Sequence, residues 1–344
     1  MKKIKIGVIG PSEIAYRRFM PALEKSDKFE YVGISIASKS EWDEKGSLSS
    51  AQFEIIMKNE YEKAKLFEIN YGGEIFNSYL ELIQSDEIEA IYLPLPPALH
   101  YKWASVALSY GKHVFIEKPA TLSATETKRL IDLSTENNLA IHENYMFVFH
   151  SQIDYLKSLM ERSEVGEIQK INIAFGFPFR GYSDFRYNKK LGGGALFDCG
   201  GYTVKLINLL MGSNVELISA VLKIDINTDV DIMGNLVYKS DRVIGQCTFG
   251  MNHSYKCDIE IWGSKGAIFT NRIFTAPIGY RPQFEVNKDG VVTKIDLSDD
   301  DTFFKSLEHF YSCIIDENTR KISSSLIMRQ AEMIDEILEK RLLI

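Results

Sequence analysis

Apolar and polar residues follow two different patterns along the chain. In the first part, short apolar runs alternate with longer stretches of helical periodicity. The apolar runs lie at residues 4–9, 31–37, 88–93, 113–116 and 139–142. Short runs that are apolar throughout are typical of parallel strands, which helices cover on both faces. The pattern predicts an α/β fold with a doubly wound parallel sheet over roughly the first 145 residues.

The second part contains consecutive strands with little helix between them. After a predicted helix over residues 152–162, strands are expected at residues 168–177, 217–226, 234–239, 243–249, 257–262, 267–270 and 291–295. The sequence Gly263-Ser264-Lys265-Gly266 has the composition of a hairpin turn. Strands that follow one another directly pair mostly antiparallel, so this part is predicted to form an α+β domain with an open, mostly antiparallel sheet.

The length of the chain predicts two domains. A chain of 344 residues exceeds what one hydrophobic core usually supports. We place the domains at residues 1–122 and 123–344. Amphipathic helices are expected at residues 302–316 and 324–342, and the last helix is expected to be able to pack back on the first domain. Residues 41–77 have polar helical character, including a helix over residues 51–67, and indicate no chemistry.

Composition excludes several kinds of partner. Acidic residues outnumber basic ones by 47 to 40, which gives a net charge of -7, and the basic residues form no cluster. Neither nucleic acid nor an anionic membrane is therefore expected as a partner. No run approaches the length of a membrane span, about 20 apolar residues. The amino-terminal run is predicted to be a strand rather than a signal peptide.

Cysteine and histidine usage bears on the compartment and on metals. The four cysteines have no close pairing such as C-x-x-C, which is typical of free thiols in a reducing cytoplasm. The six histidines show no metal-ligand spacing, so no metal is predicted. We therefore expect a cytoplasmic globular protein without a metal.

The first predicted strand ends in a glycine turn. Gly10, Ser12 and Ala15 occupy the motif positions of G-x-G-x-x-G/A, with serine in place of the middle glycine. A helical pattern follows, and the first turn of a helix offers N–H groups and a positive dipole end to a pyrophosphate. A strand, turn and helix that bind nothing would look much the same.

The second predicted strand ends in Ser38-Lys39-Ser40. This position lies about as far after the glycine turn as the residue that meets the adenosine ribose in dinucleotide-binding folds. NAD enzymes usually have an acidic residue there, which accepts a hydrogen bond from the 2′-hydroxyl. A lysine between two hydroxyls suits a 2′-phosphate, so NADP is favoured over NAD. Lysine in a surface loop is, however, commonplace.

Two charged residues follow another predicted strand. The apolar run His113–Ile116 ends in Glu117-Lys118-Pro119. Open α/β sheets bind ligands at the carboxyl ends of their strands. Glu117 and Lys118 are therefore candidates for a binding site, with a solvated turn as the alternative.

Four segments together resemble the glucose-fructose oxidoreductase, inositol dehydrogenase and MocA (Gfo/Idh/MocA) family. They are the glycine turn ending in Ile14-Ala15, the segment from Pro94 to His100, residues 111–119 with Glu117-Lys118-Pro119, and the run Leu191–Gly200. The correspondence covers nearly the whole chain in the same order. The resemblance implies an NAD(P)-binding Rossmann domain at residues 1–122 and a substrate-binding and oligomerisation domain at residues 123–344. It implies reversible hydride transfer between a nicotinamide and a sugar or polyol carbon.

The resemblance also implies which residues hold the cofactor. The expected cofactor-binding residues are Gly10, Ser12, Glu13, Ile14, Ser38, Lys39, Pro94, Leu95, Pro96, His100, Glu117, Lys118 and Pro119. A cis peptide bond is expected before Pro119. Because the family often uses its open sheet for assembly, a homodimer or homotetramer is expected.

Two departures narrow the resemblance. Many members have a histidine and then an aspartate on the helix that faces the nicotinamide, where this chain has Tyr202 and Lys205. The tyrosine form is similar to the branch that contains nucleotide-sugar 3-ketoreductases. Val148 stands where many relatives have arginine, so any substrate contact of that arginine is absent.

Reduction of a ketone needs a hydride on carbon and a proton on oxygen, so a donor must face the developing alkoxide. Our hypothesis is that Tyr202 donates this proton, while Lys118 orients the carbonyl and the nicotinamide ribose. A neighbouring ammonium group makes a phenol a better donor near neutral pH. In the alternative, Tyr202 only packs its ring at the start of a helix.

Further residues are candidates for substrate contacts. Arg180 and Arg186 lie in a polar loop, where arginine could bind a diphosphate bidentately or remain a surface charge. Asp198 and Gly200 are expected to cap the following helix, with a substrate contact by Asp198 as the alternative. The candidate substrate residues are Asn144, Tyr145, Phe177, Arg180, Arg186 and Asp198.

The sequence favours an NAD(P)-dependent oxidoreductase that reduces a keto group of a nucleotide-activated sugar, without identifying the sugar, the carbon or the direction. One alternative is a dehydrogenase of a free sugar or polyol. Another is an NAD(P)-binding regulatory protein that keeps the fold without catalysis. The presence of both Lys118 and Tyr202 favours the enzyme.

Overall fold

The computed structural model describes residues 2–43, 49–212 and 214–344 and divides the chain into two compact units. The first unit comprises Met1–Thr121, Thr125–Asn144 and Phe303–Met328, and the second comprises Leu122–Ala124, Tyr145–Thr302 and Arg329–Ile344. These units differ from a single boundary after residue 122, because later segments return to the first unit. Residues 44–48 of the predicted polar stretch lie outside the described part.

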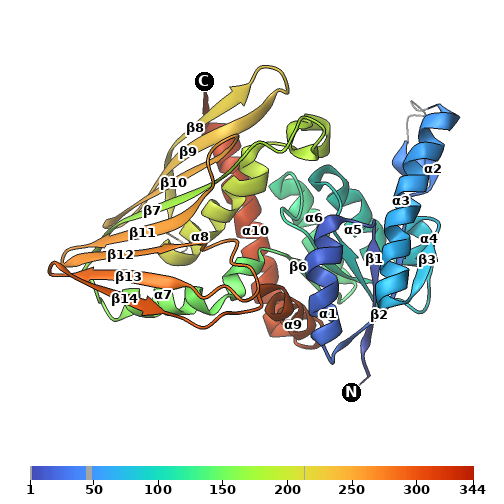
Figure 1. The fold of residues 1–344 in the computed structure, drawn as a ribbon, viewed down its shortest axis with the longest axis horizontal. Helices are drawn as coiled ribbons and strands as arrows, with labels where there is room; N and C mark the ends of the chain where they lie inside the picture. The colour runs from blue at the N-terminus through green and yellow to red at the C-terminus, as the bar shows by residue number, and fades with distance from the viewer. Residues whose placement is uncertain (1, 44–48, 213) are drawn as a thin grey trace. The chain divides into compact units, whose positions relative to one another are not determined.

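The first unit contains a six-stranded parallel sheet in the order β3-β2-β1-β4-β5-β6 (Figure 1). Its strands are β1 (Ile4–Ile9), β2 (Phe29–Ser35), β3 (Glu74–Phe76), β4 (Ala90–Leu93), β5 (His113–Ile116) and β6 (Ile141–Glu143). Its helices are α1 (Met20–Lys25), α2 (Lys39–Trp42), α3 (Ser50–Tyr71), α4 (Tyr79–Gln84), α5 (His100–Ser109), α6 (Ala124–Glu136), most of α9 (Thr302–Ile315) and the first part of α10 (Glu317–Lys340). The predicted doubly wound parallel sheet is confirmed.

Aromatic side chains fix α9 on this sheet. Phe115 of β5 packs edge-on against Phe310 of α9, with ring centroids 5.4 Å apart. Phe29 of β2 stacks on the same ring at 5.9 Å. All three rings are almost fully buried, and each buried aromatic side chain removes roughly 150–250 Å² from water. This burial explains why a late segment of the chain belongs to the first unit.

The second unit contains a nine-stranded sheet in the order β14-β13-β12-β11-β7-β10-β9-β8-β15. Its strands are β7 (Ile168–Phe177), β8 (Glu216–Asp225), β9 (Val230–Ser240), β10 (Val243–Met251), β11 (Lys256–Gly263), β12 (Gly266–Asn271), β13 (Gln283–Lys288), β14 (Val291–Asp296) and β15 (Leu342–Leu343). The pairs β7–β10 and β8–β15 are parallel and the others antiparallel. The predicted mostly antiparallel sheet is therefore confirmed.

The two faces of this sheet differ. Helices α7 (Ser151–Glu161), α8 (Gly201–Met211) and the end of α10 (Glu317–Lys340) contribute to a core with the inward side chains of the strands, such as Ile171 and Ile173. Figure 1 shows α8 along one side of the strands that run from β8 to β14. On the other face, Ile244 and Trp262 flank Lys170 on neighbouring strands and are about half exposed.

Several predictions about individual helices, strands and turns are confirmed, while a few short elements were not predicted. The hairpin turn joins β11 to β12, with Gly263 paired to Gly266, and β7 has the predicted bounds. Short β3, α4 and β13 were not predicted, and α10 begins at Glu317 rather than at residue 324. No helix among the described residues combines the length and the apolar character that crossing a membrane requires.

Candidate functional site

Neighbouring parallel strands of the first unit end in the predicted cofactor-binding residues. The strands β2, β1, β4 and β5 lie side by side in that order. Ser38-Lys39, Gly10, Pro94–Pro96 and Glu117–Pro119 follow their respective carboxyl ends. The order of strands along the chain reverses between β1 and β4, and open α/β sheets bind ligands in the crevice at such a point. The structure thus brings these residues to one edge of the sheet.

The turn after β1 is tight. Gly10 has a left-handed conformation with φ of +85°, and a Cβ atom there would lie 3.0 Å from Cδ2 of Leu95. The hydroxyl of Ser12 accepts a hydrogen bond of 3.2 Å from the Ala15 N–H. The serine in place of the middle glycine therefore caps the next helix. That helix contains a π-helical turn at Ala15–Phe19, a distortion found often at functional sites.

A network of backbone contacts orders the loop after β2. The Ser38 N–H donates a 2.7 Å hydrogen bond to Glu41. The same carboxylate accepts two more, of 3.0 and 2.9 Å, from the backbone at the start of α4. Glu41 is the acidic residue nearest in sequence to the predicted ribose-binding residues Ser38 and Lys39. Its carboxylate is already occupied by three hydrogen bonds from backbone N–H groups. The side chain of Lys39 lies over the Phe53 ring at 5.8 Å.

His100 joins the loops that follow β4 and β5. Its ring nitrogens lie 2.7 Å from the carbonyl oxygen of Pro119 and 2.6 Å from that of Leu95. Burial lowers the pKa of His100 to about 4, so at neutral pH the ring carries one proton and donates it to one carbonyl. This fully buried position favours a role in holding the two loops over the predicted direct contact with cofactor. The peptide bond between Lys118 and Pro119 is cis, as the resemblance implied.

Glu117 is held by a chain of buried hydrogen bonds. Its Oε1 accepts from the Tyr92 hydroxyl at 2.8 Å and from the Asn144 amide at 2.7 Å. Burial raises the pKa of Glu117, while these two donors and the charge of Lys118 act in the opposite direction. The oxygen of the Asn144 amide accepts from the Ser306 hydroxyl at 2.8 Å. Both ends of the Asn144 amide are thus engaged within the first unit, which favours a positioning role over the predicted substrate contact.

In the second unit, aromatic rings surround the side chain of Tyr202. It is the second residue of α8, which directly follows a π-helical turn at Leu196–Gly200. Its ring centroid lies 5.1 Å from that of Tyr145, and those of three phenylalanines lie at 5.6, 5.3 and 5.7 Å. The phenylalanines are Phe147, Phe175 and Phe274. The Tyr202 hydroxyl lies 3.8 Å from the Met146 sulfur. The ring is thus packed, as in the structural alternative.

Arg186 forms ion pairs that hold together the loop before the glycine run. Its Nε donates to Asp198 at 2.6 Å, and its Nη1 donates to Asp184 at 3.1 Å. The two carboxylates raise the pKa of Arg186 further, although burial alone would lower it. Asp198 therefore pairs with Arg186 and does not cap α8, whose N-cap residue is Gly200 and has no side chain to offer. The prediction that Asp198 caps this helix was wrong, because its carboxylate binds Arg186, which lies 12 residues earlier in the chain.

Arg180 differs from Arg186. Its guanidinium lies over the Phe177 ring at 5.0 Å, and the residue is exposed. No ion pair of Arg180 is found among the residues that the structure describes. Of the two predicted arginines, Arg180 is therefore the one with charge to offer to an anionic ligand.

Asp231 was not predicted and supports the segment that carries Tyr202. Its carboxylate accepts a 2.6 Å hydrogen bond from the Leu196 N–H, at the start of the π-helical turn. A Cβ atom on Gly194 would clash with the same carboxylate, which explains a glycine at that position. Burial raises the pKa of Asp231 to about 6. An aspartate one residue inside a long strand gives no local signal for this role.

Both parts of the chain match known families. Residues 4–145 match an oxidoreductase family with an NAD-binding Rossmann fold. Residues 153–269 match the GFO/IDH/MocA C-terminal domain. The chain belongs to the GFO/IDH/MocA family. It is therefore an oxidoreductase, and the resemblance described from the sequence is confirmed.

Two relatives indicate which branch of this family the chain resembles. It is 34% identical over 335 residues to a dTDP-3,4-didehydro-2,6-dideoxy-alpha-D-glucose 3-reductase of Actinomadura kijaniata, a match covering 97% of this chain and 94% of the relative. The protein of the same name from Streptomyces violaceoruber is 32% identical over 98% of this chain and 95% of its own length. These GFO/IDH/MocA relatives belong to the predicted 3-ketoreductase branch.

A solved member of the family has the same fold throughout. The crystal structure of a 3-ketoreductase from Actinomadura kijaniata with NADP and TDP-benzene has a TM-score of 0.90 and 32% identity, covering 100% of this chain and 99% of that chain. Forms of that protein with one tyrosine changed to phenylalanine, or one lysine changed to alanine, match with TM-scores of 0.90 and 0.86.

Proposed function

We propose that the protein is an NADP-dependent reductase of the 3-keto group of a TDP-linked deoxysugar. The observation that carries this proposal is the similarity to dTDP-sugar 3-reductases over 97% of the chain, with Lys118 and Tyr202 both present. The solved relative binds NADP and TDP-benzene. Structures of that relative with one tyrosine changed to phenylalanine, or one lysine changed to alanine, also contain TDP-benzene and NADP.

The residues at the edge of the first sheet fit a dinucleotide. Gly10 has a left-handed conformation and carries no side chain, so the backbone of this turn can approach a phosphate closely. The N–H groups of Glu13 and Ile14 begin a helix and have no partner within it, which suits a pyrophosphate. Lys39 offers a positive charge to a 2′-phosphate. A bound NADPH would supply the hydride.

In the proposed reaction, the carbonyl carbon gains a hydride and its oxygen gains a proton. We assign the proton to the hydroxyl of Tyr202, whose ring is held by four aromatic neighbours. Lys118 orients the carbonyl oxygen and stabilises negative charge that develops there. Glu117, through Tyr92 and Asn144, holds the strand end that carries Lys118. Preorganised groups of this kind act without having to rearrange during the reaction.

The function is tested by following NADPH oxidation with purified protein. We expect turnover with a TDP-linked 3-keto-deoxysugar and at least about a hundredfold lower kcat/KM with free keto sugars, because the nucleotide supplies binding energy. NADPH binding without oxidation by any nucleotide sugar would instead favour the regulatory protein. Turnover that is highest with a free sugar or polyol would favour the other alternative.

The proposed preference for NADP depends on Lys39. We expect Lys39→Glu to raise the KM for NADPH by about tenfold or more, since one lost phosphate contact of about 1.4 kcal/mol corresponds to that factor. The value of kcat should change little. Steady-state kinetics with NADPH and NADH measure both. Lys3→Glu, at another exposed lysine of the first unit, is the control. Equal loss with both cofactors would contradict a role at the 2′-phosphate.

We also propose that the open face of the nine-stranded sheet joins copies of the chain into a homodimer or homotetramer. Ile244 of β10 and Trp262 of β11, the two strands that flank β7 on this face, are 52% and 47% exposed. Exposed apolar groups gathered on one face are typical of protein interfaces. Trp262→Glu should lower the mass measured by light scattering, whereas Trp42→Glu on α2 should not. A wild-type protein with the mass of one chain would overturn the proposal.

A cytoplasmic location is supported by the cysteines. All four are buried free thiols: Cys199, Cys247, Cys257 and Cys313. Unlinked thiols suit a reducing compartment. Fractionation of the cells that make the protein would test this location.

A further inference from the structure

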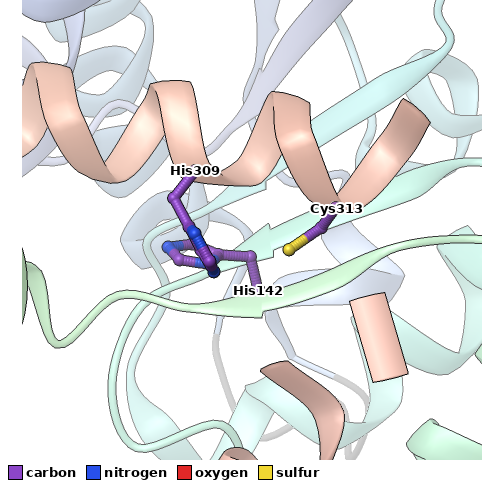
Figure 2. Close-up of side chains that lie close together, drawn as sticks. All are labelled: His142, His309 and Cys313. Carbon is purple, nitrogen blue, oxygen red and sulfur yellow. The ribbon is translucent and has the colours of Figure 1, made fainter. Parts of the chain in front are cut away.

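Three side chains with metal-binding atoms meet in the first unit, and none of them is a proposed cofactor-binding residue. His142 lies on β6, while His309 and Cys313 lie four residues apart on α9. Their ligand atoms all lie within 4.8 Å of one another. Figure 2 shows His309 and Cys313 extending from one helix toward His142 on the strand below. No metal was predicted from the sequence, because the spacing of His309 and Cys313 indicates a metal site only once α9 packs on β6 and brings His142 beside them.

We propose that His142, His309 and Cys313 bind a Zn²⁺ ion. Two imidazoles and one thiolate form a donor set that suits Zn²⁺, whereas Mg²⁺ and Ca²⁺ prefer oxygen ligands. Zn²⁺ binds nitrogen at about 2.0–2.1 Å and sulfur at about 2.3 Å in tetrahedral geometry. Ligand atoms already within 4.8 Å of one another need only small side-chain movements to reach these distances. The fourth position is left to water or another small ligand.

A second observation fixes the orientation of His142. The Ser306 hydroxyl donates its proton to Asn144 at 2.8 Å, so toward Nε2 of His142, 2.9 Å away, it acts as an acceptor. The ring proton of His142 therefore lies on Nε2, and the lone pair lies on Nδ1, where a metal can bind. A hydrogen bond that fixes the tautomer in this way is what metal-binding histidines usually have.

Burial and charge at the site are compatible with metal binding. Burial lowers the pKa of His309, so its ring is neutral and able to bind a metal at neutral pH. Burial raises the pKa of the Cys313 thiol to about 11, so the thiol proton is released to solvent when the sulfur–zinc bond forms. Arg320 donates to the Cys313 carbonyl at 3.4 Å. Its positive charge repels a cation, but it also acts to lower the pKa of the Cys313 thiol and so favours the thiolate that binds the ion. His309 is only partly buried, which leaves a route for the ion.

The proposed ion would act on the structure rather than on the reaction. β6 is one of the two edge strands of the first sheet, and α9 comes from a distant part of the chain. One ion bound to both would add a link between them beyond the packing of Phe310 on Phe115. Ser306 and Asn144 connect the site to Glu117. The proposal of a zinc site does not depend on the proposed reductase function, so an experiment can contradict either proposal without contradicting the other.

The test uses tag-free, metal-free, full-length protein titrated with Co²⁺ and then with Zn²⁺. We expect one equivalent of Co²⁺ to give a thiolate-to-cobalt absorption band with the intensity of a tetrahedral site, and Zn²⁺ to displace it. Cys313→Ser should abolish the band, and His309→Gln should weaken binding by more than tenfold. Ser306→Ala should keep the band but weaken binding about tenfold or more. Cys257→Ser, at a buried thiol of the second unit, is the matched control and should bind as the wild type does.

Absence of a stoichiometric thiolate band in the wild type would overturn the proposal. So would a band that persists in Cys313→Ser or is lost in Cys257→Ser. If Cys313→Ser does not fold, His309→Gln decides, because its side chain is partly exposed. Unchanged affinity of that variant would then overturn the site. Thermal unfolding gives a second readout, since Zn²⁺ should raise the Tm of the wild type and not that of the ligand variants.

Discussion

Replacing Tyr202 with phenylalanine is expected to lower kcat by about 10²–10⁴-fold, the usual contribution of a general acid. The affinity for NADPH should stay within about twofold, because the substitution removes one hydroxyl and leaves the ring in its aromatic cluster. The ring contacts with Tyr145, Phe147 and Phe175 do not depend on that hydroxyl. Steady-state kinetics and a fluorescence titration with NADPH separate the two effects.

A tyrosine of the same cluster provides the control. The ring of Tyr145 lies 5.1 Å from that of Tyr202, and its hydroxyl accepts from the side chain of Gln330 at 3.4 Å. Tyr145 is almost fully buried, which favours a packing role over the predicted substrate contact. Tyr145→Phe removes the same group without removing the proposed donor, so kcat should fall by less than about threefold. A loss of at most about 1 kcal/mol in unfolding free energy is expected from this weak hydrogen bond. Near-normal turnover of Tyr202→Phe would transfer proton donation to Lys118.

The sequence predicted those elements whose pattern is local. The alternating run of β7 gave the observed bounds, Ile168–Phe177, because its inward positions all face one core. β13 was not predicted, although it pairs with neighbours on both sides. Its sequence, QFEVNK, is short and buries only Phe284 and Val286. Pairing that depends on neighbouring strands leaves little trace in six residues.

At the candidate site, too, the residues with a local sequence signal were predicted, whereas the partners that the fold brings to them were not. The rule that ligands bind at the carboxyl ends of strands predicts Glu117 and Lys118 as site residues from the sequence. The partners of Glu117 come from other strands, and nothing near Asn144 in the chain indicates that its amide supports this carboxylate. The mistaken cap at Asp198 has the same cause. A helix-start pattern suggests capping, whereas the loop fold brings Arg186 to that carboxylate.

Replacing Lys118 with methionine is expected to lower kcat/KM for the sugar by about 10²-fold or more. The side chain keeps its length but loses the ammonium group that would stabilise charge on the carbonyl oxygen. The loss should also raise the pKa of Glu117 further, since the charge of Lys118 opposes the effect of burial there. The pH dependence of cofactor binding would report this change.

Lys112 is the matched control for this substitution. It precedes β5, and its Nζ donates to the carbonyl oxygens of Ser85 and Ile88 at 2.8 and 2.6 Å. Lys112→Met leaves two carbonyls without this donor, so unfolding free energy should fall by about 1–3 kcal/mol while kcat changes little. If both lysine variants lose activity in proportion to their stability, Lys118 has a structural role and the catalytic hypothesis fails.

The double variant, Lys118→Met with Tyr202→Phe, tests whether the two residues serve one reaction step. Residues that act as a unit are strongly non-additive, because removing one already abolishes the effect of the other. If Tyr202 donates a proton to the oxygen that Lys118 stabilises, the kcat of the double variant should be little lower than that of the less active single variant. Independent roles would instead multiply the two losses. Multiplied losses would mean that the ammonium and the phenol act at different steps, and Lys118 would then be assigned to cofactor binding alone.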